Sequence, residues 1–266
     1  MGIIGAILGD IAGSSFEFTT KRYNINDDYE LFTLGDLFTD DTVLSIATME
    51  AMNTNKDFAN CYQKYGKKYI DVGYGPSFMG WLHMEQPKPY NSLGNGSAMR
   101  CSYIGQKLKH CPFKKKVLKM ARKSAEVTHN HPEGIKGAET VAICVWMAER
   151  GKSKEEILQY ALKQYPSSKY KYGCDIPTKE YQKTITYDVT CMGSVPVAIR
   201  CFYDTDSFDS CQRLINSMNC DADTIGAIAG AICESYYGFC TDNDVNLLER
   251  YLDDFLLDKL RKYKII

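Results

Sequence analysis

The stretch that decides the fold is DADTIGAIAGAICESYYG, residues 221–238. It begins with two carboxylates, Asp221 and Asp223, and continues as a nearly uncharged run that includes Gly226 and Gly230. The apolar content predicts a buried helix, and its acidic start lies where the positive end of the helix dipole favours anions. The two glycines indicate close contact with neighbouring helices. We therefore expect a central helix whose first turn presents carboxylates.

A second acidic cluster, Thr39-Asp40-Asp41, precedes another helical stretch, residues 41–52. Neither cluster contains Lys or Arg. Carboxylate and hydroxyl oxygens are the ligands that Mg²⁺ prefers, and two anionic clusters brought together without a cation would repel each other. Each cluster alone is also a good helix-capping sequence. Two of them together favour a shared site for two cations, about 3.5–4 Å apart.

The rest of the chain is dominated by helical patterns. Helical spacing of apolar residues recurs in residues 3–15, 56–70, 114–126, 134–150, 154–164 and 244–263. Loops rich in Gly, Pro and Ser are expected over residues 71–97, 127–134 and 165–197, and only 183–190 has the composition of a strand. Because no repeat or linker interrupts the pattern, the sequence predicts an all-α fold and a single domain over residues 1–266.

Bulk composition excludes several classes of protein. The 266 residues carry a formal net charge of -1, which argues against a protein that holds nucleic acid mainly by neutralising its phosphates. A nucleic acid could still be a substrate if it carries a modified nucleotide. The eleven cysteines form no C-x-x-C pair, which predicts free thiols in a reducing compartment, and we expect a cytoplasmic location. The apolar start before Asp10 is too short to span a membrane and lacks a basic segment, so no membrane partner is expected.

Two other segments offer groups for chemistry. Glu17 follows the break Gly13-Ser14-Ser15 and could either reach a metal centre or stand in solvent. Residues 91–100 form a glycine-rich turn whose free backbone N–H groups would suit a phosphate, although they match neither the P-loop nor the dinucleotide fingerprint. Tight turns also need glycine for purely structural reasons.

A pair of histidines, His129 and His131, lies in the loop 128–132. No Cys or acidic residue is spaced to complete a tetrahedral zinc site, so hydrogen bonding to a ligand or to the loop is favoured over zinc. No nucleophile elbow supports a Ser/Cys–His hydrolase.

Seven segments, in order, resemble the motifs of the ADP-ribosylglycohydrolase family. They are Gly9-Asp10-x-x-Gly13-x-x-x-Glu17, Phe38–Thr42, Gly73-Tyr-Gly75, Ser92–Arg100, Thr128-His129, Gly193–Pro196 and Asp221–Gly230. The resemblance runs through almost the whole chain and implies an orthogonal helical bundle with two Mg²⁺ ions, for which Mn²⁺ can often substitute. The sequence departs from the family pattern at Asn219-Cys220, where the family often has Gly-Gly. This difference removes none of the implied metal ligands.

The resemblance also assigns roles by motif match. The implied metal ligands are Thr39, Asp40, Asp41, Asp221, Asp223 and Thr224. The implied catalytic residues are Glu17, Asp40 and Asp223, with Glu17 as a mobile acidic residue near the metals. The implied substrate-binding residues are Gly75, Ser92, Gly94, Asn95, Gly96, Met99 and His129.

The function implied is hydrolysis of the glycosidic bond between ADP-ribose and a modified protein or small molecule. Arginine is the expected acceptor because Glu17 followed by Phe18 resembles the bacterial nitrogen-linked branch of the family. Serine, polymeric and nucleobase linkages stay open, and the choice is expected in residues 18–36 and 165–190. A non-catalytic ADP-ribose-binding module and a metal phosphohydrolase acting on the pyrophosphate are the alternatives. We expect a monomer.

Overall fold

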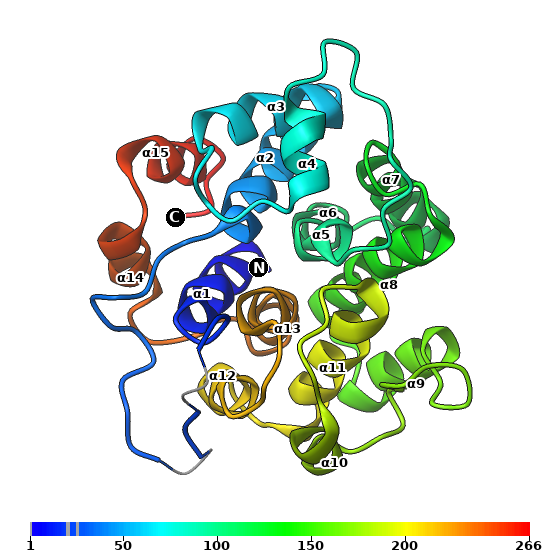
Figure 1. Cartoon of the computed structure of the whole chain (residues 1–266), viewed down its shortest axis with the longest axis vertical. Coiled ribbons are helices and arrows are strands. Elements are labelled where there is room, and N and C mark those ends of the chain that lie inside the picture. The colour runs from blue at the N-terminus through cyan, green and yellow to red at the C-terminus, as the bar shows by residue number, and fades with distance from the viewer. Residues whose placement is uncertain (1, 20–21, 25–26) are drawn as a thin grey trace.

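A computed structural model describes residues 2–19, 22–24 and 27–266, and its regular elements are helices (Figure 1). The all-α expectation is therefore confirmed. The strand-like composition of residues 183–190 produces no strand, since the only pairing of strand type in the described ranges is an isolated bridge between Gly94 and Thr190. Part of the 18–36 segment, residues 20–21 and 25–26, lies outside the described residues.

The helices run in chain order as follows. They are α1 (Ile3–Ser14), α2 (Asp40–Thr54), α3 (Phe58–Lys68), α4 (Pro76–Leu82), α5 (Gly96–Met99), α6 (Ser102–Lys107), α7 (Lys114–Glu126), α8 (Pro132–Glu149), α9 (Lys154–Gln164), α10 (Thr178–Thr184), α11 (Cys191–Asp204), α12 (Phe208–Asn216), α13 (Ala222–Tyr237), α14 (Asp244–Tyr251) and α15 (Asp254–Lys262).

Several helices differ from the sequence-based expectation. Short α4 and α10 occupy stretches expected as loops, where Gly and Pro obscure the helical period. The start of α11 was also expected as loop because it contains Pro196, which removes one backbone donor from the helix interior. The expected helix over 244–263 is two helices, because the chain becomes extended at Leu252, after the end of α14, and Asp253 then caps α15 by accepting a hydrogen bond from Leu256 N at 2.9 Å.

The helices α1 and α13 lie side by side near the centre of the molecule (Figure 1). A β-carbon added to Gly9 would lie 2.1 Å from the carbonyl oxygen of Gly226, and one added to Gly226 would lie 2.4 Å from the oxygen of Gly9. Gly5 and Gly230 make the same reciprocal approach. Residue numbers rise along α1 where they fall along the facing side of α13, so the two helices are antiparallel. Their backbones touch at these glycines without intervening side chains.

This contact decides where the acidic residues lie. A β-carbon at Gly13, near the end of α1, would lie 2.3 Å from the carbonyl oxygen of Ala222, the first residue of α13. Glu17, which follows α1, is therefore brought beside Asp221 and Asp223, which flank Ala222. Residues more than two hundred positions apart become neighbours through this packing.

The cysteines agree with the expectation of free thiols. All eleven are within the described part of the chain and are free, and Cys111 is the partly exposed one among otherwise buried thiols. Among the described residues, no helix combines the length and apolarity needed to cross a membrane.

The backbone contact predicts how single methyl groups act on stability. Gly9→Ala should lower the free energy of unfolding by at least about 3 kcal/mol, because the new methyl group meets a backbone carbonyl that cannot move aside. Gly80→Ala in α4 is the matched control, since nothing lies within 4 Å of its β-carbon position. It should be neutral or stabilising by about 0.5–1 kcal/mol. Urea denaturation of both variants measures the difference, and equal effects would contradict the packing.

Candidate metal centre and substrate cavity

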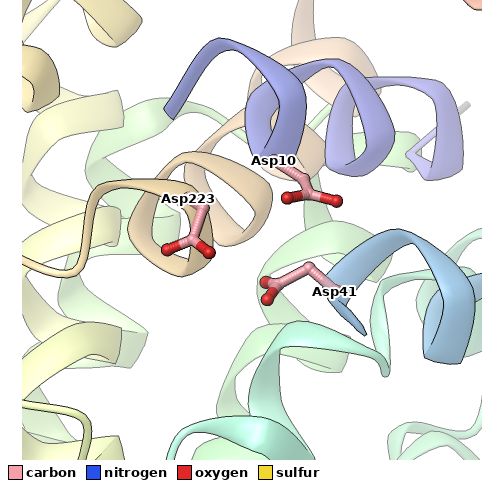
Figure 2. Close-up of side chains that lie close together, drawn as sticks. All are labelled: Asp10, Asp41 and Asp223. Atoms are coloured by element: carbon pink, nitrogen blue, oxygen red, sulfur yellow. The ribbon is translucent and has the colours of Figure 1, made fainter. Parts of the chain in front are cut away.

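Three carboxylates from three helices lie close together (Figure 2). Asp10 comes from α1, Asp41 from α2 and Asp223 from α13, and each offers an oxygen within 4.8 Å of the other two. Glu17 and Asp221 form a second such group with Asp223. The side chain of Asp223 is therefore shared by two adjoining groups of possible metal ligands.

Burial and mutual repulsion make these carboxyl groups hard to ionise. Burial, followed by the charge of Asp223, raises the pKa of Asp10 to about 7 and that of Glu17 to about 8. The same two causes, in the same order, raise the pKa values of Asp40, Asp41 and Asp221 well above the ordinary range. The protein alone does not compensate this density of negative charge.

The donor set fits a hard divalent cation. Asp41 Oδ1 is buried without a hydrogen-bond partner among the described residues, while its Oδ2 accepts a hydrogen bond from Thr224 Oγ1 at 3.1 Å. Thr39 Oγ1 donates to Asp10 at 2.7 Å and accepts from Asp41 N at 3.3 Å, which leaves one lone pair unused. An orphaned carboxylate oxygen among oxygen donors alone is what Mg²⁺ or Mn²⁺ would satisfy.

Asp10 has a role that the sequence does not single out. Its oxygens accept hydrogen bonds from the backbone N–H groups of Thr39 and Thr42, at 2.9 and 3.1 Å, and from both hydroxyl groups. Asp10 therefore fixes the start of α2 against α1. It is the one charged residue within α1, and that isolation in an apolar helix was the available signal.

Asp40 lies apart from both carboxylate groups, although it stands next to Asp41. Its backbone N–H donates to Val72 O at 2.9 Å, and its Oδ1 lies 3.6 Å from the β-carbon position of Gly73. Asp40 thus faces the cavity from the side of the 72–75 loop.

A cavity of about 490 Å³ opens onto the carboxylates. Every residue to which the sequence assigned a role lines it: Glu17, Thr39, Asp40, Asp41, Gly75, Ser92, Gly94, Asn95, Gly96, Met99, His129, Asp221, Asp223 and Thr224. Its volume is in the usual range for small-molecule sites.

The glycine-rich loop is tied to the acidic cluster through Asn95. Its side-chain Nδ2 donates to Asp221 Oδ2 at 2.6 Å and to Ser194 Oγ at 2.8 Å. Two of the backbone amides expected to be free are engaged, because Gly94 N donates to Ser92 Oγ and Asn95 N donates to Val189 O. The loop is therefore held in a defined shape by hydrogen bonds of its own.

The two histidines make separate hydrogen bonds. His131 caps α8 by accepting from Glu133 N at 3.1 Å, and His129 Nδ1 lies 2.6 Å from Thr128 Oγ1. Both histidines therefore make the hydrogen bonds to their own loop that the sequence favoured. In the described ranges, neither histidine belongs to a group of possible metal ligands.

Among the further residues that line the cavity, four bear on its chemistry. Phe18 and Tyr187 are 84% and 42% exposed, with ring centroids 6.3 Å apart, and Tyr187 donates to Glu17 Oε1 at 2.7 Å. Tyr90 and the fully buried Arg100 line the cavity as well. Arg100 and Phe18 lie in segments that carry the family resemblance, Ser92–Arg100 and Glu17-Phe18, whereas Tyr187 lies in the stretch 183–190, which has only the composition of a strand.

Comparisons with known proteins match nearly the whole chain. The model of the ADP-ribosylglycohydrolase family matches residues 1–243. ADP-ribosylhydrolase ARH3 of Homo sapiens is 27% identical over 89% of this chain and 84% of its own length. The ADP-ribosyl-[dinitrogen reductase] glycohydrolase of Rhodospirillum rubrum is 26% identical over 88% and 84%. A solved structure described as an ADP-ribosylglycohydrolase-related protein complex shares the fold, with a TM-score of 0.67 and 20% identity over 97% of this chain and 96% of that one.

The raised pKa values predict how the stability of the metal-free protein depends on pH. A carboxyl whose pKa is raised on folding keeps a proton that the unfolded chain has released. With pKa values of about 7 for Asp10 and 8 for Glu17, stability is full below about pH 4 and is lost as the pH rises to about 8. We expect a loss of at least about 2 kcal/mol between pH 5 and 9 without cations. Thermal unfolding in chelator at each pH measures it.

Divalent cations should reverse this loss, with a larger gain in melting temperature at pH 8 than at pH 5. Asp41→Asn is the matched variant, because the amide keeps the shape of the side chain and removes one charge. It should flatten the pH dependence and weaken the response to Mg²⁺. A cation response unchanged in Asp41→Asn would show that the ions bind elsewhere.

Proposed function

Because this chain belongs to the ADP-ribosylglycohydrolase family, we propose that it hydrolyses the glycosidic bond between ADP-ribose and arginine with the help of two Mg²⁺ ions. The observation that carries the proposal is the convergence of Asp41, Asp221, Asp223 and Glu17 on one wall of a cavity that the glycine-rich loop also lines. Mn²⁺ is the expected substitute because the donors are oxygens.

The cavity is electrically asymmetric. One part carries the carboxylates, and another is lined by His129 and Arg100. The side chain of Arg100 is fully buried and forms no ion pair among the described residues, so its positive charge is not neutralised there. ADP-ribose has an anionic diphosphate and a neutral distal ribose. The diphosphate is attracted to the side of Arg100, which directs the ribose and its C1″ towards the carboxylates.

The carboxylates and Glu17 have separate tasks in this proposal. Asp221 and Asp223 face the positive charge that develops on the ribose as the glycosidic bond breaks. Glu17, steadied by the hydrogen bond from Tyr187, exchanges a proton with the attacking water or the departing acceptor. When bound, the cations would offset the carboxylate charge and polarise oxygens near them.

The rim beside Glu17 supports arginine as the acceptor. Phe18 and Tyr187 form an exposed aromatic pair next to the carboxylate of Glu17. Aromatic faces attract the planar guanidinium group, and the carboxylate adds an opposite charge.

We further propose that residues 1–266 act as one cytoplasmic catalytic domain and as a monomer. The hydrophobic core, which includes residues from Ile3 to Ile265, supports a single domain, and the free thiols support a reducing compartment.

The activity is tested with ADP-ribosyl-arginine and Mg²⁺. Free ADP-ribose and arginine should appear, chelator should stop their release, and Asp223→Asn should be inactive. Glu17→Gln should still bind ADP-ribose and cations but turn over at least about 100-fold more slowly. Release of AMP would instead identify a phosphohydrolase, and binding without turnover would identify an ADP-ribose-binding module.

The acceptor preference is tested at the rim. Phe18→Ala should lower kcat/KM for the arginine-linked substrate about tenfold, because one face of the guanidinium site is lost. It should leave any hydrolysis of serine-linked ADP-ribose unchanged. Phe113→Ala is the control, since Phe113 is also exposed but does not line the cavity. Equal losses on both substrates would contradict a role of Phe18 in recognising arginine.

A further inference from the structure

A chain of hydrogen bonds connects Arg100 to His129 beneath the cavity. Arg100 Nη2 donates to Thr128 Oγ1 at 2.9 Å and to Ser124 O at 3.0 Å. Thr128 Oγ1 in turn lies 2.6 Å from His129 Nδ1. Thr128 is fully buried and His129 is 4% exposed, so water does not compete for these groups.

The hydrogen atoms of this chain can be placed by counting donors. A guanidinium group only donates, so Thr128 Oγ1 accepts from Arg100. If His129 Nδ1 also donated to that oxygen, the hydroxyl hydrogen of Thr128 would be buried without an acceptor among the described residues. When the hydroxyl instead donates to Nδ1, each hydrogen has a partner. The remaining ring hydrogen then resides on Nε2.

The imidazole ring is neutral in this arrangement. Burial, followed by the charge of Arg100, holds the pKa of His129 well below its ordinary value. A neutral ring has one donor and one acceptor nitrogen, and its neighbour decides which is which.

The donor nitrogen faces the cavity. His129 Nε2 lies 3.6 and 3.5 Å from the β-carbon positions of Gly94 and Gly96, on the glycine-rich loop. The absence of side chains at these two residues leaves the approach to Nε2 open.

We propose that Thr128 is a positioning residue which, with Arg100, locks His129 as the Nε2–H tautomer so that the ring donates a hydrogen bond to an acceptor oxygen of the ADP-ribosyl group. This inference rests on the proposed function for the identity of the ligand. The lock itself is a property of the free protein. With the other tautomer, a lone pair would face the electron-rich oxygens of the substrate and repel them.

The lock is tested first without substrate. Nitrogen-15 NMR of the imidazole groups distinguishes the two neutral tautomers, with His129 assigned through the His129→Gln variant. The wild-type protein should show hydrogen on Nε2 across the neutral pH range. Thr128→Val keeps the shape and removes the hydroxyl, and it should give a mixture of tautomers, whereas Thr128→Ser should restore the Nε2–H form.

The consequence for ligand binding is tested with ADP-ribose by calorimetry. Thr128→Val should weaken binding about tenfold, and Thr128→Ser should bind within about twofold of the wild type. In turnover of the arginine-linked substrate, KM should rise while kcat stays within about twofold, because the contact is made in both ground and transition states.

A double-mutant cycle separates positioning from a structural role. In a His129→Gln background, Thr128→Val should have no further effect on the Kd for ADP-ribose. An equal loss in both backgrounds, or an Nδ1–H tautomer in the wild-type protein, would overturn the proposal. A correct tautomer in a protein that neither binds nor hydrolyses ADP-ribosyl compounds would instead contradict the proposed function.

Discussion

Direct backbone contact between α1 and α13 is the constraint on which the rest of the structure depends. Gly5 and Gly9 meet Gly230 and Gly226 with no room for side chains, and this fixes the position of each helix along the other. The residues with chemical roles occupy the ends of this contact. Glu17 follows α1, and Asp221 and Asp223 begin α13, so two segments from opposite ends of the chain form one site. Helix packing thus assembles the site from segments that are far apart in the sequence, and no single motif contains it.

The second constraint is electrostatic. Asp10 is satisfied by four hydrogen bonds from Thr39 and Thr42, while Asp41 retains a buried oxygen without a partner. The fold therefore uses one carboxylate to join α1 to α2 and leaves others to repel one another. Such a distribution lowers the stability of the ion-free protein and is typical of sites whose function requires the charge.

Sequence patterns anticipated what depends on local composition. The bounds of α7 and α9 were as expected, and the acidic starts of α2 and α13 pointed to a shared centre. Patterns failed where tertiary contacts override local signals. Pro196 indicated a loop, yet packing keeps it inside α11. Tyr187 carries no signal of its own, because its importance arises from a hydrogen bond to Glu17, 170 residues away. Likewise, the Thr128–His129 pair was visible as a motif, but the buried guanidinium group behind it was not.

The distribution of thiols has a practical consequence. Ten cysteines are shielded, and burial raises the pKa of Cys174 and Cys191, for example, to about 12, so they are poor nucleophiles. Cys111 reaches the surface and does not line the cavity. A maleimide fluorophore or spin label would therefore attach at one position of the natural chain without prior removal of the other cysteines. Such a probe could follow rotational diffusion or surface immobilisation of the protein while the cavity stays unmodified.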